Sequence, residues 1–308
     1  MPSKHAWLAF LIACGAHSGE QTVAAEQIAI PRVERMPNIP QPFKMRDWRA
    51  LAHAYDRFIF DFNAKGEFLP LVWWDDSRIN INRATFGLPA YVGTPNATGT
   101  RHEGGTCLAA VLGATIAGID KSQGEHNWVL MCEAYYNRKN GENLVLNGVS
   151  AHSGGSFWYD LWNHILFYAL ADRYPKVGSL EAIMRTTADR WHDACVAMGG
   201  DKGVPDFNHT AFAFRTMKPV DNGRWREPDS AAGIAWLEYM AWIKWRDPKH
   251  LQAADWAMQF LNAWPEGPLY EVLMPFGAHE AGKIVGHRVR VDRPFQALDN
   301  QVGNFIPA

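Results

Sequence analysis

The chain has 308 residues, enough for one large domain or two ordinary ones, and 47% of them are hydrophobic while only 20% are charged, which excludes wholesale disorder. The 30 Lys and Arg residues are balanced by 32 Asp and Glu residues and form no basic block, so the sequence lacks the clustered positive charge that binding to nucleic-acid phosphates requires. No apolar run approaches the ~18–20 residues of a membrane span, so we expect no membrane-spanning helix.

Residues 1–30 predict an export signal and leader that is not part of the fold. A positively charged start precedes a short apolar stretch at 6–13, which is typical of a signal peptide and too short for a membrane helix. Leu-Ile-Ala-Cys, which ends at Cys14, resembles a bacterial lipobox, in which Cys14 would carry a lipid anchor. Ordinary secretion with cleavage after 23–25 is the alternative. We therefore expect an exported protein, periplasmic, lipid-anchored or extracellular, with a Pro-rich linker at 31–46.

Apolar residues at helical spacing predict an all-α domain over residues 47–284. The helices are expected, in chain order, at 47–64, 104–119, 127–137, 156–173, 179–198 and 229–246, then from Pro248 through Leu261, followed by an eighth element that opens at Pro268 and is interrupted at Pro275. The helix over 229–246 is apolar on nearly all sides, which is typical of a helix buried all round. Only 143–149 predicts a strand, in a small hairpin after Asn140 and Gly141.

The connections between these helices alternate between long and short, and the long ones are 65–103, 138–155 and 199–228. Short links make neighbouring helices antiparallel, so helices that alternate up and down bring every long connection to the same end. Long ordered loops within a compact domain are usually functional. The sequence therefore predicts one plain face and one elaborated face, with the site on the second.

Buried helices that alternate with amphipathic ones, paired as hairpins with long loops on one face, resemble the (α/α) toroid of the six-hairpin glycosidase-like proteins. That group includes secreted glycoside hydrolases and polysaccharide lyases. The resemblance covers residues 47 to about 284 and rests on architecture rather than on a motif. It implies a saccharide groove at the loop end of the inner helices, lined by aromatic rings and cut by carboxylates, or by a His/Tyr/Arg set in the lyases.

The sequence departs from the toroid in its number of helices. Each hairpin consists of two helices, so a complete toroid of six hairpins has more helices than the seven or eight that the periodicity predicts. The helical periodicity ends before the irregular tail 285–308. We therefore expect an incomplete toroid, the N-terminal part of a longer protein; closure by the tail is the alternative.

The first long loop holds two tryptophans beside two carboxylates, Trp73, Trp74, Asp75 and Asp76. Sugars stack their apolar faces on aromatic rings and donate hydroxyl hydrogens to carboxylates, so the tryptophans are candidate substrate-binding residues and the carboxylates candidate catalytic ones. Adjacent side chains on an extended segment point in opposite directions, so only one carboxylate would serve a site. A Trp-rich strap with a solvated turn is the structural alternative.

The same loop ends at His102 and Glu103, directly before two glycines and the second helix. A glutamate near a helix N-terminus would be held ionised by the helix dipole, which favours Glu103 as a base or a nucleophile. Simple helix capping by Glu103 is the alternative. His102 is a candidate substrate-binding residue, because it could pair with a carboxylate.

The end of the second long loop carries three further candidates for substrate binding, His152, Trp158 and Tyr159. They flank the glycines at 154–155, which would let the backbone approach a ligand closely. A glycine turn followed by Ser156 as a helix cap explains the segment without any ligand.

The leading functional hypothesis is a secreted carbohydrate-active enzyme that cleaves glycosidic bonds with two carboxylates. They would be drawn from Asp75, Asp76, Glu103 and Glu271, the last beside the substrate-binding candidate Tyr270 at the start of the eighth element. One carboxyl group would act protonated and the other ionised, about 5 Å apart for retention or roughly 6.5–9.5 Å for inversion.

Two other functions are weighed against this one. A uronate lyase would use His152 or His209 together with Tyr159 in place of the carboxylate pair. A non-catalytic glycan-binding or interaction protein, an inactive fragment, is the second.

The sequence predicts neither a metal nor an organic cofactor. Cys107, Cys132 and Cys195 lie in apolar helical patterns, without a CxxC pair or a Cys/His spacing suited to zinc, so we expect buried thiols. The GxxxxGK pattern at 277–283 is not a P-loop, because Ile284 stands where magnesium binding requires Ser or Thr.

Overall fold

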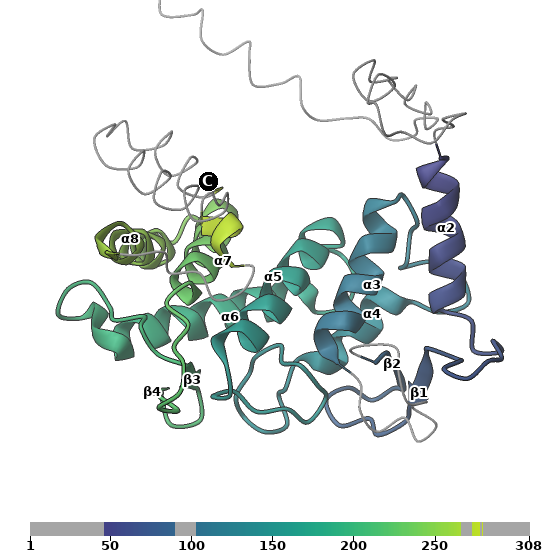
Figure 1. Cartoon of the computed structure of the whole chain (residues 1–308), viewed down its shortest axis with the longest axis horizontal. Coiled ribbons are helices and arrows are strands. Elements are labelled where there is room, and N and C mark those ends of the chain that lie inside the picture. Colours follow the sequence, from purple (N-terminus) through teal and green to yellow (C-terminus); the bar gives the residue numbers. More distant parts are fainter. Residues whose placement is uncertain (1–45, 90–102, 266–272, 278, 280–308) are drawn as a thin grey trace, which may run out of the picture. The chain divides into compact units, whose positions relative to one another are not determined.

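The computed structural model of the protein describes residues 46–89, 103–265, 273–277 and 279. From Asp47 on they belong to one compact unit. In the described part the protein is mostly helical, with two small antiparallel hairpins (Figure 1), so the expectation of a helical protein is confirmed in this coarser form. The predicted export signal with Cys14, the linker and the tail lie outside the described residues.

The helices follow the apolar periodicity of the sequence. They are α2 (Trp48–Ile59), α3 (Gly104–Ile116), α4 (Trp128–Met131) continued by a 3₁₀ turn (Cys132–Tyr135), α5 (Phe157–Arg173), α6 (Leu180–Cys195) continued by a π turn (Val196–Gly200), α7 (Ser230–Trp245) and α8 (Pro248–Ala263). Asp47 caps α2 by accepting the Ala50 N–H, and Asp247 caps α8 by accepting the Lys249 N–H. No helix in these described stretches is long and apolar enough to cross a bilayer.

The three long connections lie against one another. The Asn80 side chain, from the first connection, donates to the carbonyl of Val149 in the second at 2.7 Å. In turn, Ser153 of the second accepts the N–H of Phe214 in the third at 2.9 Å. Figure 1 draws both β-hairpins at the same lower edge of this unit. The loops thus gather as the alternation of long and short links predicts.

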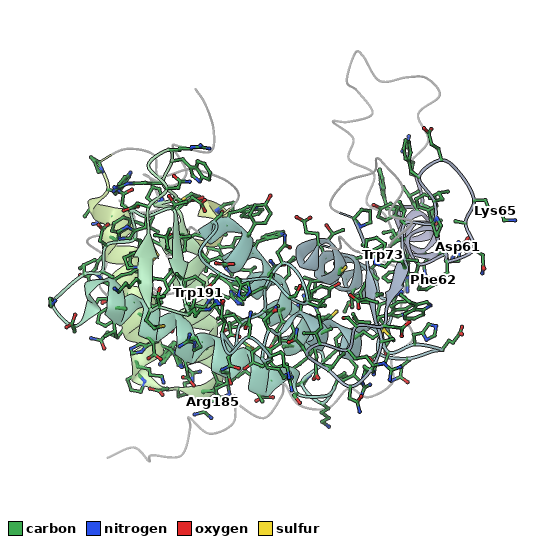
Figure 2. All side chains as sticks on the ribbon, turned by 90° about the horizontal axis from the view of Figure 1, so that it is seen from below. Asp61, Phe62, Lys65, Trp73, Arg185 and Trp191 are labelled. Atoms are coloured by element: carbon green, nitrogen blue, oxygen red, sulfur yellow. The ribbon has the colours of Figure 1, made fainter. Side chains whose placement is uncertain are left out.

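The strands lie elsewhere than the sequence predicts. β1 (Trp73–Asp75) pairs with β2 (Thr85–Gly87), and β3 (Ala211–Ala213) pairs with β4 (Lys218–Val220). Trp73, labelled in Figure 2, stands opposite Gly87, and its ring fills the space that a Cβ at Gly87 would need. These strands are too short to carry a period-2 signal.

The predicted strand over 143–149 is wrong. Val145 makes only an isolated antiparallel bridge to Tyr136, and the rest of the segment forms no ladder. Its apolar side chains, centred on Leu144 and Leu146, are buried in the helical core, so the apolar run reflects burial rather than sheet pairing. The stretch of the eighth element before Leu273 lies outside the described residues; Leu273 is not helical, and a new helical turn begins at 274–277 with Pro275 near its start. A proline is tolerated in the first turn of a helix, where its missing N–H has no partner to lose.

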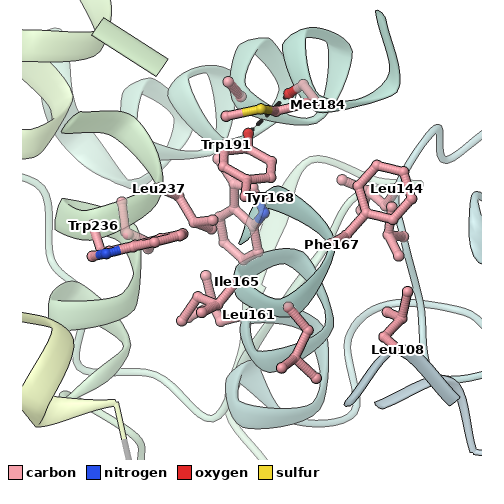
Figure 3. Close-up of a cluster of buried hydrophobic side chains, with 14 of the residues drawn as sticks. Leu108, Leu144, Leu161, Ile165, Phe167, Tyr168, Met184, Trp191, Trp236 and Leu237 are labelled. Atoms are coloured by element: carbon pink, nitrogen blue, oxygen red, sulfur yellow. Dashed lines mark hydrogen bonds between the residues drawn. The ribbon is translucent and has the colours of Figure 1, made fainter. Parts of the chain in front are cut away.

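The core of the unit is built around α5 and α7. Every residue from Ser230 to Tyr239 of α7 is buried, which confirms the prediction of an enclosed helix over this stretch, whereas 242–245 are half-buried. α5 packs against α3, α6 and α7, and Figure 3 shows its side chains between Leu108 on one side and Trp236 on the other. The Tyr168 hydroxyl satisfies its buried oxygen by donating to the Met184 carbonyl at 2.9 Å. Each large apolar side chain buried here contributes about 1.5–3 kcal/mol.

Candidate functional site

A pocket of about 680 Å³ lies between α2, α3 and α5. One face of each helix contributes to it, because residues three or four apart on a helix project the same way. Its walls are apolar and aromatic, with a few polar groups at its base. The lining residues used below are Tyr55 from α2, Glu103, Gly105 and Thr106 at the start of α3, Asn147 from the second long connection, and Trp158, Tyr159, Trp162 and Asn163 from α5.

Glu103 is the carboxylate of this pocket. It is half-buried at the N-cap position of α3, yet its side chain bonds no N–H of the first helical turn, so the capping alternative does not apply. Instead, one oxygen accepts the hydroxyl of Thr106 at 2.9 Å and the other accepts the amide of Asn147 at 3.1 Å. A carboxylate that accepts hydrogen bonds on both oxygens is matched to the ionised form, which has no proton to donate.

Two asparagine amides hold Glu103 in place. The Asn147 side-chain oxygen accepts the Gly105 N–H at 3.0 Å and the Asn163 amide at 3.4 Å, while the Asn163 amide also donates to the Tyr159 carbonyl. Because every partner of each amide nitrogen is an acceptor, the orientation of both side chains is determined. The Asn163 oxygen is then left buried without a hydrogen-bond partner.

Aromatic rings form the wall opposite the α3 groups. Trp158 and Trp162, one turn apart on α5, stack with ring centroids 5.0 Å apart. Tyr159 and Tyr55 are 51% and 62% exposed, although large aromatic side chains are normally covered. Glu227 holds the start of α5 in place by accepting the Trp158 N–H at 2.7 Å. The predicted candidates Glu103, Trp158 and Tyr159 therefore meet in one pocket.

The tryptophan pair of the first loop does not line this pocket. Trp74 stacks on Phe62, with centroids 4.6 Å apart, and on Trp128, 5.8 Å apart. Asp75 accepts the N–H of Ser77 at 2.7 Å, which closes a local turn, and Asp76 is exposed. In Figure 2, Trp73 and Phe62 lie at the same end of the unit. Packing accounts for these rings in the way that the structural alternative describes.

His152 also lies outside the pocket lining. It is exposed, and its Nδ1 lies 2.9 Å from a carboxylate oxygen of the buried Glu142. The other oxygen of Glu142 accepts the Ser153 N–H at 2.9 Å, so this pair anchors the second long connection. The other predicted site residues, His102, Tyr270 and Glu271, lie outside the described residues.

Three polar side chains in the first half of α5, Asp160, Asn163 and His164, are buried. Burial raises the pKa of Asp160 well above its ordinary value, and the neighbouring carboxylates Glu142 and Glu227 add to the effect. His164 accepts the indole N–H of Trp191 at 3.0 Å, and burial lowers the pKa of its imidazole to about 3. Of this helix's amides and acids, only Asn163 lines the pocket.

A second unusual carboxylate, Glu238 of α7, lies far inside the core. It is fully buried, and its nearest partner is Nδ1 of His250 at 2.7 Å rather than a backbone carbonyl. Burial raises the pKa of Glu238 to about 7. Both side chains are buried and neither lines the pocket, so we assign the pair a structural role.

Two further kinds of chemistry find no support in the structure. Cys107, Cys132 and Cys195 are buried free thiols, as the sequence predicts, and burial raises the pKa of Cys107 to about 12, which leaves it unreactive. Within the described stretches, no group of three or more His, Cys, Asp or Glu side chains is placed to hold a metal ion.

Sequence reasoning missed Asn147 and the wall formed by α2. Asn147 lies 44 residues from Glu103 in sequence, and only the packing of the second long connection under α3 brings the two together. Asn163 had a local signal, because it follows Tyr159 by one helical turn. The chain matches no family model, and comparison with curated proteins and with solved structures finds nothing similar.

Proposed function

We propose that the protein is a secreted carbohydrate-active enzyme that cleaves a glycosidic bond of a saccharide held between α2, α3 and α5. The observation that carries the proposal is Glu103, a carboxylate oriented by Thr106 and Asn147 at the base of a pocket with aromatic walls. Stacked rings such as Trp158 and Trp162 suit the apolar faces of sugar rings.

The proposed scaffold is an (α/α) toroid, incomplete within the described residues. Helical hairpins support it, because α5 packs against α6 and α7 packs against α8. The gathering of the three long connections supports it as well.

In the proposed mechanism Glu103 acts in its ionised form, as a base that activates water or as the nucleophile. Thr106 and Asn147 would hold its oxygens in place, and the tryptophan wall would position the sugar ring. The described pocket lining supplies this one carboxylate. The second, which protonates the leaving group, is proposed to be Glu271.

The test is the variant Glu103→Gln, which keeps the shape of the side chain and removes its charge. Against a panel of oligosaccharides and polysaccharides, we expect release of reducing ends to fall by about a hundredfold or more, while saccharide binding persists. Glu125→Gln removes the same charge from an 88% exposed side chain away from the pocket and is the control. Unchanged turnover in Glu103→Gln would contradict the proposal.

A glycan-binding protein without catalysis is the second candidate. It is favoured by the single carboxylate among the described lining residues. Its signature is tight saccharide binding by the wild-type protein without new reducing ends.

The lyase alternative gains no support from the geometry. Neither of its histidines lines the pocket: His152 pairs with Glu142, and His209 lies 3.2 Å from Asp221. Appearance of an unsaturated, ultraviolet-absorbing product would restore it.

A further inference from the structure

The charge around the pocket is one-sided. Among the lining residues that the structure describes, Glu103 carries the only charge, and it is negative. No described lysine, arginine or histidine lines the pocket. A carboxylate ligand would need such a cation, because a second negative charge beside Glu103 is repelled more strongly in a partly dry pocket than in water.

Several buried side chains at the start of α5, the helix that carries the tryptophan wall, are also acidic. Three buried acidic side chains, Glu142, Asp160 and Glu227, cluster at the start of α5, and burial together with the other two raises the pKa of Asp160 well above its ordinary value. The nearby guanidinium of Arg190 is directed elsewhere, because it donates to the backbone carbonyls of Glu142 and Phe214.

Among the uncharged polar groups at the base of the pocket, one buried acceptor, the Asn163 side-chain oxygen, has no partner. The amide nitrogens of Asn147 and Asn163 are used within the protein, by Glu103, by the Asn147 oxygen and by the Tyr159 carbonyl. The Asn163 oxygen is buried without a partner, in a residue that is 1% exposed. Hydroxyl groups, which donate, match such a site better than carboxylates, which only accept.

We infer that the pocket selects saccharides that carry no carboxylate group, that it rejects uronate-containing ones, and that Glu103 sets this preference. The inference rests on the proposed function and narrows its substrate class. The expected discrimination is roughly ten- to hundredfold in affinity, for two like charges about 7 Å apart at an effective dielectric constant of about 20.

The experiment compares matched ligands on the full chain. Fragments of several polyuronates are titrated beside their carboxyl-reduced forms, which keep the linkage and become neutral sugars, and neutral oligosaccharides complete the panel. We expect each reduced form that binds to do so about tenfold or more tightly than its uronate parent. In Glu103→Gln this gap should shrink to about threefold or less, whereas Glu125→Gln should keep it in full.

A second measurement needs no variant. Because the discrimination is electrostatic, raising the salt concentration from about 0.01 M to about 1 M should narrow the gap in the wild-type protein. Uronate fragments that bind the wild type as tightly as their reduced forms, or a gap that neither salt nor Glu103→Gln alters, would overturn the inference alone. Absence of binding to every saccharide, neutral or acidic, would overturn the proposed function and this inference with it.

Discussion

Two regions of the unit differ in how far they bury their apolar and aromatic side chains. In the core region around α7, aromatic rings and even the acid Glu238 are enclosed. In the pocket region, α2 has no buried residue, and its apolar stripe stays exposed at Trp48, Leu51, Tyr55 and Phe58. Both helices show the apolar pattern that predicts a helix, but only packing decides whether that face is covered. Of this exposed stripe, Tyr55 lines the pocket.

The largest effect should come from breaking the core's buried pair. His250→Ala leaves Glu238 without its 2.7 Å partner in a site with no access to water. We expect the free energy of unfolding to fall by about 1–3 kcal/mol in urea titrations, because the buried carboxyl group of Glu238 loses its hydrogen-bond partner. Replacing both residues by leucine should cost less than His250→Ala alone. A loss below about 1 kcal/mol for His250→Ala would contradict this account of the pair.

The same pair should make stability depend on pH. Burial raises the pKa of Glu238 from 4.5 in the unfolded chain to about 7 in the folded protein, so the folded state holds the proton more tightly. This contribution is fully present below pH 4.5 and is lost as the pH rises through 7, with a slope of up to about 1.4 kcal/mol per pH unit. His164 acts in the opposite sense, since its lowered pKa costs stability as the pH falls below 6.5.

The measurement that isolates Glu238 is therefore a difference. The stability of the wild type relative to Glu238→Gln should fall steadily from about pH 5 to about pH 7.5. The difference in stability between the wild type and Glu125→Gln, a change at an exposed site, should not vary with pH over the same range. A flat curve for Glu238→Gln would show that burial does not hold this proton.

Two glycines of α3 offer a smaller and sharper test in the pocket region. A Cβ at Gly105 would lie 3.2 Å from the Asn163 oxygen and 3.3 Å from the Trp162 ring, whereas a Cβ at Gly113 meets nothing within 4 Å. Gly105→Ala should weaken saccharide binding by roughly tenfold, because it crowds the base of the pocket. Gly113→Ala should leave binding unchanged and stabilise the helix by about 0.5–1 kcal/mol. Equal binding by both variants would remove Gly105 and its neighbours from the site.

The smallest effect on stability is expected on α2. Tyr55 is 62% exposed, so Tyr55→Ala should change the unfolding free energy by less than about 0.5 kcal/mol. Saccharide affinity should nevertheless fall about fivefold, because the ring is part of the pocket wall. A large loss of stability with unchanged binding would reverse the assignment of α2.

The helices could be predicted from the sequence because their signal is local. Apolar spacing located α5 and α7 to within a few residues of their observed ends, and the alternation of link lengths predicted that the long connections gather. The strands could not be predicted, because three-residue strands such as those of β1 and β2 carry no periodicity. The apolar run around Val145 shows the same limit, because a segment buried against helices and a strand buried in a sheet have the same apolar sequence pattern.

The candidate site was predictable only in part. Glu103, Trp158 and Tyr159 were identified because each stands beside glycines at the start of a helix. Trp74 was identified for the same chemistry, yet its ring packs on Phe62 and Trp128. A stacked tryptophan looks alike in sequence whether its partner is a sugar or another side chain.

The account depends most on where a saccharide binds, and two tryptophan variants test this directly. The affinity for an oligosaccharide that the wild type binds should be measured in Trp162→Ala, within the pocket, and in Trp74→Ala, in the packed strap. We predict that Trp162→Ala loses roughly tenfold or more in affinity, while Trp74→Ala stays within about twofold of the wild type. Loss of binding in Trp74→Ala with full binding in Trp162→Ala would contradict the assignment of the pocket.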